Sequence, residues 1–254
     1  MFFHFFVHKI CYNFHDLFML SFHFSCDLPS YMFFAFILCY NADNGKEMMI
    51  METMCYDKKA VKEVAELLKN GKVVAFPTDT VFGLGVIYES EEALQALKES
   101  KGRPESKPIP TMVADVEQMK KIAVMSEDAC ALADAFMPGA FTLILKKQDT
   151  LPDYVTNGFL TVGIRMPDDP FVLSLIAECG KPLLVTSANR SGAKTGVSSD
   201  EVLEQLNGRI DAIVLGEAEG KLASTIVDMS SGEAVIVREG PIPASAIQAV
   251  LHKG

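Results

Sequence analysis

The stretch VVAFPTDTVFGLG, residues 73–85, places a polar segment directly after a short apolar run. Residues 73–76 are apolar and rich in β-forming residues, which predicts a buried strand. Pro77 has no N–H to donate, so it ends the hydrogen bonding of that strand. Three short polar side chains follow at the strand end, where α/β sheets commonly bind ligands: Thr78, Asp79 and Thr80. Gly83 and Gly85 allow a close backbone approach or a positive φ, so the stretch predicts either a ligand-binding strand end or a plain proline turn.

The chain on either side of this stretch alternates between helical and strand patterns. An apolar face predicts a helix over residues 57–70, which Asp57 caps and Gly71 stops. Further helices are predicted to begin at residues 90, 116, 126, 169, 200 and 243, and strands are predicted over residues 73–76, 109–114, 142–146, 161–165, 182–186, 212–215, 224–228 and 234–238. The alternation predicts an α/β fold, and the late strands with little helix between them indicate a mixed sheet. We expect one domain over residues 57–251, which is long enough for a substantial core.

Residues 1–47 differ in kind from the rest of the chain. Residues 1–40 hold eleven of the seventeen Phe, and no Arg occurs before Arg103. The longest clean apolar run, residues 31–40, is too short to span a bilayer. We expect that translation begins at Met48, Met49 or Met51, and that the preceding residues are upstream nucleotide sequence read as protein. The alternative is a membrane-associating arm, and a peptide from residues 1–40 in the mass spectrum of the native protein would rule out the misread start.

Composition limits the function classes. The chain carries 33 acidic and 23 basic residues, a net charge of −10. A protein that grips nucleic acid through phosphate usually has a basic surface, so this balance argues against such a task. The 6 Cys show no metal-ligand spacing and no C-x-x-C motif, which indicates reduced thiols, no metal site and a cytoplasmic location.

A cluster of cations follows the second predicted helix. Lys101, Arg103 and Lys107 lie within seven residues of one another, beside Gly102 and Pro104, which predict a non-helical turn. Arginine offers forked hydrogen bonds and lysine a point charge, so the cluster suits a triphosphate, although a solvated basic loop gives the same pattern. No G-x-x-x-x-G-K-[ST] motif occurs, so a P-loop is excluded.

Two further strand ends carry polar groups. Ser187 and Asn189 directly follow the strand predicted over residues 182–186 and could bind a ligand or form an Asx or Ser turn. Thr161 and Arg165 lie four residues apart on one strand and therefore share a face. Arg165 could pair with a carboxylate or lie in solvent at a sheet edge.

These motifs, taken in order, resemble those of the YrdC-type L-threonylcarbamoyladenylate synthases. The family pattern is a P-T-[DE]-T-x-[YF]-G-L-G strand end, a K-x-R and an S-x-N, and the likeness runs from about residue 57 to about 251. It implies a single YrdC/RibB-like domain, a twisted mixed sheet flanked by helices around a concave ligand cavity. Some relatives carry a second domain, and we expect this chain to be the short form that lacks it.

The resemblance also implies roles for individual residues. It gives catalysis to Lys101 and Arg103. It assigns contacts with ATP to Lys101, Arg103, Lys107, Thr161, Ser187, Asn189, Thr195 and Arg238. It assigns the threonine site to Thr80, Met112, Arg165, Val185 and Ser224. Asn189 is further expected to shape its turn, and Asp79 to cap its own turn.

The implied reaction joins L-threonine, bicarbonate and ATP into L-threonylcarbamoyl-AMP with release of pyrophosphate. Mg²⁺ would be held mainly by the ATP phosphates. The product would feed N6-threonylcarbamoyladenosine formation in tRNA through a separate transferase complex, with at most a weak contact to tRNA and no membrane. The alternative is an RNA-binding or ribosome-maturation module on the same fold. A carbamoyl-transfer domain of hydrogenase-maturation proteins is a third reading, but their additional segments are absent from this sequence.

Overall fold

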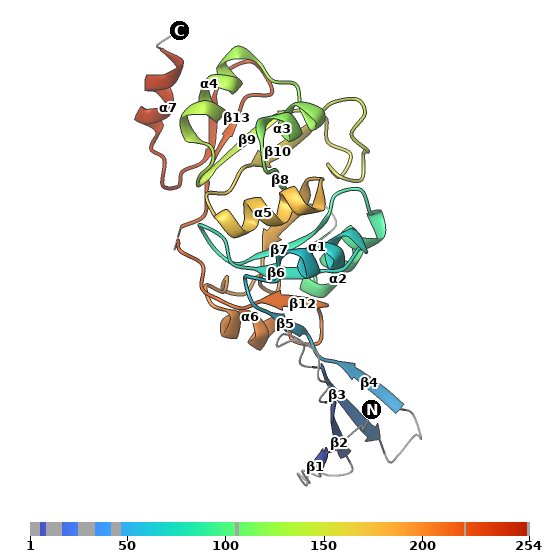
Figure 1. Cartoon of the computed structure of the whole chain (residues 1–254). Helices are drawn as coiled ribbons and strands as arrows, with labels where there is room; N and C mark the ends of the chain where they lie inside the picture. The colour runs from blue at the N-terminus through green and yellow to red at the C-terminus, as the bar shows by residue number, and fades with distance from the viewer. Residues whose placement is uncertain are drawn as a thin grey trace.

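The computed structural model of this chain describes residues 6–8, 17–24, 34–41, 47–104, 107–220 and 222–252, with side chains from residue 52 onward. Two sheets are present in that part of the chain (Figure 1). A 4-stranded sheet has the order β1-β2-β3-β4, and its strands are β1 (Phe6–His8), β2 (Leu17–Phe24), β3 (Phe34–Asn41) and β4 (Glu47–Met51). It shares no strand pairing with the second sheet among the described residues. The predicted extension over residues 1–47 lies partly outside the described residues and stays a prediction.

The 10-stranded sheet has the order β14-β13-β9-β10-β8-β11-β7-β6-β12-β5. Its strands are β5 (Met54–Tyr56), β6 (Val74–Phe76), β7 (Gly83–Ile87), β8 (Thr111–Met112), β9 (Phe141–Lys146), β10 (Thr161–Arg165), β11 (Leu183–Ser187), β12 (Ala212–Val214), β13 (Thr225–Asp228) and β14 (Val235–Arg238). Parallel and antiparallel pairs occur side by side, for example β10 with β8 and β10 with β9. The predicted α/β fold with a mixed sheet is confirmed.

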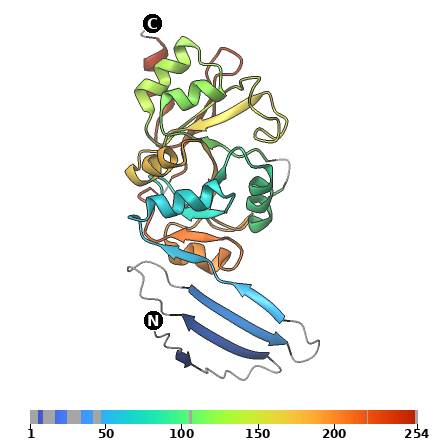
Figure 2. The ribbon, with the colours of Figure 1, turned by 45° about the vertical axis from the view of Figure 1, so that its right-hand side comes forward.

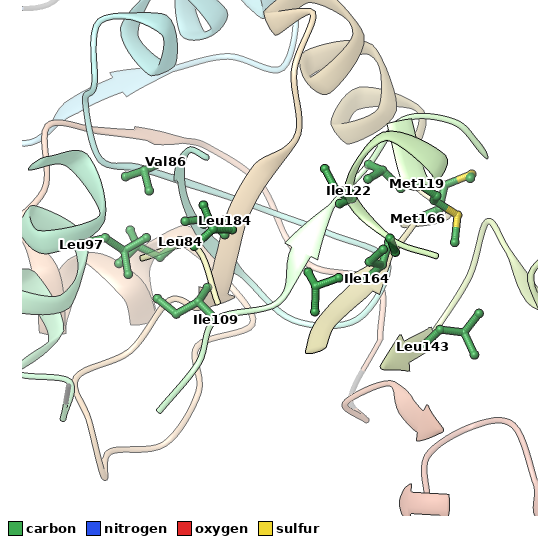
Figure 3. Close-up of a cluster of buried hydrophobic side chains, with 14 of the residues drawn as sticks. Leu84, Val86, Leu97, Ile109, Met119, Ile122, Leu143, Ile164, Met166 and Leu184 are labelled. Atoms are coloured by element: carbon green, nitrogen blue, oxygen red, sulfur yellow. The ribbon is translucent and has the colours of Figure 1, made fainter. Parts of the chain in front are cut away.

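Helices cover both faces of this sheet (Figures 1 and 2). They are α1 (Val61–Lys69), α2 (Glu91–Lys101), α3 (Val116–Ile122), α4 (Glu127–Phe136), α5 (Pro170–Cys179), α6 (Ser199–Leu206) and α7 (Ala244–Leu251). Helices α1 and α5 lie against each other and bury one core with Val74, Phe76 and Val185. The other helices contribute to a larger core, which Figure 3 shows in part, including Leu97 and Leu84. Burial of apolar surface on two sides therefore fixes the sheet between helices.

Local capping signals account for most helix starts. Ser90, Asp115, Ser126 and Asp169 each accept a hydrogen bond from the backbone N–H three residues on, as N-cap side chains do. The predicted start at Asp57 is wrong. Helix α1 begins at Val61 without a side-chain cap, because the Asp57 carboxylate accepts instead from the N–H of Lys59 at 2.8 Å.

The stretch at residues 73–85 forms a hairpin, which is more than the predicted strand and loop. Strands β6 and β7 pair antiparallel, with Phe76 opposite Gly83. Neither Gly83 nor Gly85 has a positive φ. A Cβ on Gly85 would lie 2.9 Å from the Phe76 ring, and one on Gly83 would lie 2.9 Å from the Val185 side chain. The glycines are therefore needed for close packing, and the hairpin turn presents Thr78, Asp79 and Thr80 together.

Strand β8 is shorter than the predicted strand over residues 109–114. Pro108 and Pro110 flank Ile109 and cannot donate to a ladder, so regular pairing is confined to Thr111 and Met112. The carbonyl of Pro110 still accepts from the N–H of Val185 at 3.0 Å. The prolines thus keep the segment against β11 while limiting its length. Sequence patterns also missed β5, which adds an edge strand ahead of residue 57.

Thr111 carries a buried hydroxyl without a hydrogen-bond partner among the described residues. Its side chain is 0% exposed. Replacing the hydroxyl by a methyl group in Thr111→Val is expected to raise the free energy of unfolding by about 1 kcal/mol, because an unpaired polar group loses its hydration on burial. Chemical denaturation measures the change. Thr156→Val is the matched control, since the buried Thr156 hydroxyl donates to the Phe159 carbonyl at 2.7 Å and its loss should destabilise the protein. A destabilised Thr111→Val variant would contradict the expectation.

In the part of the chain that the structure describes, no helix combines the length and the apolar character needed to cross a bilayer.

Candidate active site

A cavity of about 410 Å³ is lined by residues of strands β7, β8, β9, β10, β11 and β14 and by the connecting segments next to them. This volume is in the range of small-molecule sites. Its lining combines hydroxyl, guanidinium and apolar groups. The residues are Thr78, Thr80, Val81, Phe82, Gly83, Arg103, Pro108, Pro110, Met112, Thr142, Arg165, Val185, Thr186, Ser187, Thr195, Ala223, Ser224 and Arg238.

Three guanidinium groups line this cavity, those of Arg103, Arg165 and Arg238, and no described carboxylate side chain does. Burial lowers the pKa of Arg103. Burial also lowers the pKa of Arg238, and the charge of Arg165 lowers it further. Each guanidinium stays charged, because arginine cannot be deprotonated under ordinary conditions. The cavity is therefore a positive site in a chain of net charge −10, and an anionic ligand would relieve the repulsion between its cations.

Arg165 is anchored by the hairpin turn. Its Nη2 donates to Asp79 Oδ1 at 2.6 Å and its Nη1 to Thr80 Oγ1 at 2.7 Å. Its Nε donates to the carbonyl of Gly139 at 3.2 Å. The side chains of Arg165 and Asp79 are 8% and 9% exposed, so this is a buried ion pair. Burial lowers the pKa of Arg165, while the charge of Asp79 and its hydrogen bond raise it.

The expected role of Asp79 as a cap of its own turn is wrong, because its carboxylate pairs with Arg165. The cap is Thr78, whose Oγ1 accepts from the N–H of Thr80 at 3.1 Å and donates to the carbonyl of Val81 at 2.7 Å. Because the Thr78 hydroxyl donates its proton to that carbonyl, the Thr80 hydroxyl must be the donor in the 3.1 Å hydrogen bond between the Thr78 and Thr80 hydroxyls. Thr80 Oγ1 accepts from Arg165 and keeps one lone pair for a ligand.

A second hydrogen-bonded group surrounds Ser224. Its Oγ lies 2.8 Å from Thr142 Oγ1. Arg238 donates to the Ser224 carbonyl through Nε at 3.0 Å and through Nη2 at 2.8 Å. A Cβ on Gly240 would lie 2.7 Å from the Ser224 carbonyl carbon, so only glycine permits this approach of β14 to the cavity rim. The arrangement fixes a hydroxyl and a cation next to each other.

The third group links Arg103 and Ser187. Arg103 donates from Nη2 to the carbonyl of Pro108 at 2.9 Å, and its Nη1 lies 3.4 Å from Thr186 Oγ1. Ser187 Oγ donates to Asn189 Oδ1 at 2.6 Å. The Asn189 amide nitrogen donates to the carbonyls of Arg190 and Ala193 at 2.8 and 2.9 Å. Asn189 therefore holds the turn in place, as its predicted shaping role requires.

The structure brings most predicted site residues to the cavity and places four elsewhere. Those at the cavity are Thr80, Arg103, Met112, Arg165, Val185, Ser187, Thr195, Ser224 and Arg238. Those outside its lining are Lys101, Lys107, Thr161 and Asn189. Lys107 is exposed, whereas Lys101 is buried and its ammonium group contacts protein oxygens. Lys101 also lies in α2, not in the predicted turn.

Sequence reasoning gave no role to Thr142 or Thr186. It allowed Arg165 either a carboxylate partner or a place in solvent; the buried pair confirms the first alternative, but Asp79 was not named as the partner. One signal for the pair was present. An arginine at the end of an apolar strand needs a buried partner, and Asp79 is the acidic residue within the polar segment that follows the first predicted strand. Thr142 carried no comparable signal, because its cavity position depends on pairing of β9 with β10 and β13.

The described residues contain no group of three or more His, Cys, Asp or Glu side chains placed to hold a metal ion. The side-chain oxygens that line the cavity belong to hydroxyl groups, and the nearby carboxylate of Asp79 is paired with Arg165.

Comparisons with known proteins identify the family. The Sua5, YciO and YrdC family model, described as telomere recombination, matches residues 66–240. The chain is also 34% identical over 204 residues to a putative threonylcarbamoyl-AMP synthase of Methanocaldococcus jannaschii, covering 78% of this chain and 96% of that protein. The chain belongs to the Sua5/YciO/YrdC family.

Two further family members match over most of this chain. The threonylcarbamoyl-AMP synthase of Bacillus subtilis is 40% identical over 194 residues, which cover 75% of this chain and 56% of that protein. The crystal structure of Pyrococcus abyssi Sua5 complexed with L-threonine superposes with a TM-score of 0.74 and 35% identity, covering 77% of this chain and 58% of that one. The chain thus spans little more than half the length of these two Sua5/YciO/YrdC proteins.

Proposed function

We propose that this chain is an L-threonylcarbamoyl-AMP synthase. It would condense L-threonine, bicarbonate and ATP and release pyrophosphate and water. The observation that carries the proposal is the cavity itself, in which three guanidinium groups and a row of hydroxyls converge at the strand ends of a Sua5/YciO/YrdC fold. The family members named threonylcarbamoyl-AMP synthase and the relative complexed with L-threonine support the substrate assignment.

The amino-acid substrate would bind beside the hairpin turn. Arg165 has two N–H donors beyond the three that it uses on protein oxygens, and these suit the threonine carboxylate. Thr80 and Ser224 would contact the polar groups of threonine, and Met112 and Val185 would line its apolar side. The same cavity would place these groups next to the nucleotide.

The nucleotide would bind along the remaining cavity wall. Arg103 and Arg238 would neutralise phosphate charge, with Ser187 and Thr195 as hydroxyl partners. Three further residues with predicted ATP contacts lie outside the cavity lining. They would contact ATP at the margin of the site or support the residues that do: Lys107, Thr161 and Asn189. The substrate would be the Mg²⁺ complex of ATP, with the ion held by phosphates and water.

The chemistry needs no protein nucleophile. Threonine and bicarbonate form an N-carboxylated amino acid with loss of water. One oxygen of that carboxylate attacks the α-phosphorus of ATP, the bond from the α-phosphorus to the bridging oxygen breaks, and pyrophosphate leaves with the electron pair. This chain would contribute in-line positioning and cationic stabilisation of the leaving phosphates.

We further propose the cellular setting. The product would pass to a tRNA threonylcarbamoyl transferase complex that makes N6-threonylcarbamoyladenosine, and contact of this chain with tRNA would be weak. The free thiols of Cys55, Cys130 and Cys179 support a reducing, cytoplasmic location. The alternative of an RNA-binding module is weaker, because three arginines gather in one small cavity and the chain carries a net charge of −10.

The test is pyrophosphate release by purified protein with ATP, Mg²⁺, bicarbonate and each common amino acid. We expect turnover that requires both threonine and bicarbonate. Absence of turnover in folded protein that binds ATP would refute the synthase. Salt-dependent nanomolar binding of tRNA under the same conditions would instead favour the RNA-binding module.

A further inference from the structure

Lys101 lies behind the cavity wall and is fully used by the protein. It is the last residue of α2, and 3% of it is exposed. Its ammonium group donates to the carbonyl of Ser187, to the carbonyl of Asn189 at 2.6 Å, and lies 3.4 Å from Asn189 Oδ1. An ammonium group has three donors, so these oxygens account for all of them. No donor remains for a phosphate.

The backbone at Lys101 holds the same turn. Its carbonyl accepts from the N–H of Ser191 at 2.9 Å. The next residue, Gly102, adopts the left-handed conformation with φ 61° and ends the helix, which directs Arg103 back to the cavity. Lys101 therefore joins two segments that line the cavity, the one with Arg103 and the one with Ser187.

We propose that Lys101 is a positioning residue that clamps the turn of residues 187–191 to the end of α2, and that it does not contact ATP. This inference rests on the proposed function for its kinetic consequence and on the geometry alone for its location. Removing the clamp would let Ser187 and Arg103 move relative to each other. Misplacement of reacting groups by about 1 Å can cost about 100-fold in rate.

Selective acetylation of the wild-type chain tests the location without any assay of turnover. Acetic anhydride is added at neutral pH with and without the Mg²⁺ complex of ATP, and modified lysines are quantified by mass spectrometry. Burial and the charge of Arg103 lower the pKa of Lys101 to about 7, so a reagent that reached it would react with it readily. We expect Lys101 to react at least about 100-fold more slowly than Lys121, which is exposed and outside the cavity, in both conditions, because reaction requires local opening. Rapid modification that ATP suppresses would overturn the proposal.

A double-mutant cycle tests the kinetic consequence. Lys101→Met and Ser187→Ala are each expected to lower the rate of pyrophosphate release, and the double variant is expected to be no slower than the slower single variant, because both act on one unit. Losses that multiply would show that Lys101 acts independently and would overturn the proposal. If Lys101→Met does not fold, the acetylation result decides. If the wild type releases no pyrophosphate, the synthase proposal fails, while acetylation still tests the clamp.

Discussion

Replacing Arg103 with alanine is expected to lower kcat/KM for pyrophosphate release by about 1000-fold, the upper range for loss of one preorganised donor to developing charge. Arg103 is held by the Pro108 carbonyl at 2.9 Å and lies at the cavity partly buried, so it needs little reorganisation to meet a phosphate. Its partial burial also strengthens the interaction relative to water. Initial rates at varied ATP measure the effect.

Two control variants sharpen this experiment. Arg103→Lys keeps the charge but loses the planar fork and should recover less than about tenfold of the lost activity. Arg209→Ala removes an exposed arginine that does not line the cavity and should stay within about twofold of wild type, as surface changes usually do. Arg103→Ala with more than a tenth of wild-type activity would remove Arg103 from the proposed phosphate site.

Variants of the buried Asp79–Arg165 pair are expected to change the stability of the protein and its activity in different ways. Asp79→Asn leaves the guanidinium of Arg165 buried without its counter-charge, and we expect a loss of about 3–5 kcal/mol in the free energy of unfolding. In the double variant Asp79→Asn with Arg165→Met the buried charge is gone, so most of that stability should return. Threonine-dependent turnover should stay absent in the double variant, because the proposed carboxylate partner has been removed.

Urea denaturation and the pyrophosphate assay together read out this second experiment. The distinguishing result is a double variant that is more stable than Asp79→Asn and yet shows no threonine-dependent turnover at saturating ATP. Its affinity for ATP, measured by calorimetry, should remain within about tenfold of wild type, because Arg103 and Ser187 are untouched. Threonine-dependent turnover in the double variant would show that Arg165 does not bind the substrate.

Much of the fold could be predicted from local signals. The helices α3 and α5 begin where Asp115 and Asp169 cap them, and Gly180 ends α5 in the left-handed conformation. Strand β10 coincides with the predicted strand over residues 161–165. Such signals act within a few residues, so a single sequence displays them.

Other features depend on distant partners. From the sequence alone, Gly83 and Gly85 indicate a loop. In the structure they begin a paired strand, and they pack closely against the Phe76 ring and the Val185 side chain. The expected cap at Asp79 gave way to an ion pair with a residue 86 positions away. Sequence motifs cannot rank a local turn against such a pair, because the energy of the pair depends on burial that only folding creates.

By itself, the sequence determined the α/β class, the strand ends that carry polar groups, and a family resemblance that the comparisons confirm at the level of the Sua5/YciO/YrdC family. The tertiary structure decided which of these groups meet. Ser187, Arg103 and Arg165 share one cavity, whereas Lys101 is turned away from it and bound to carbonyl oxygens. The physical reason is that a buried charged side chain forms hydrogen bonds with the oxygens that packing places near it. That packing depends on residues from the whole sheet, which are far apart in the sequence.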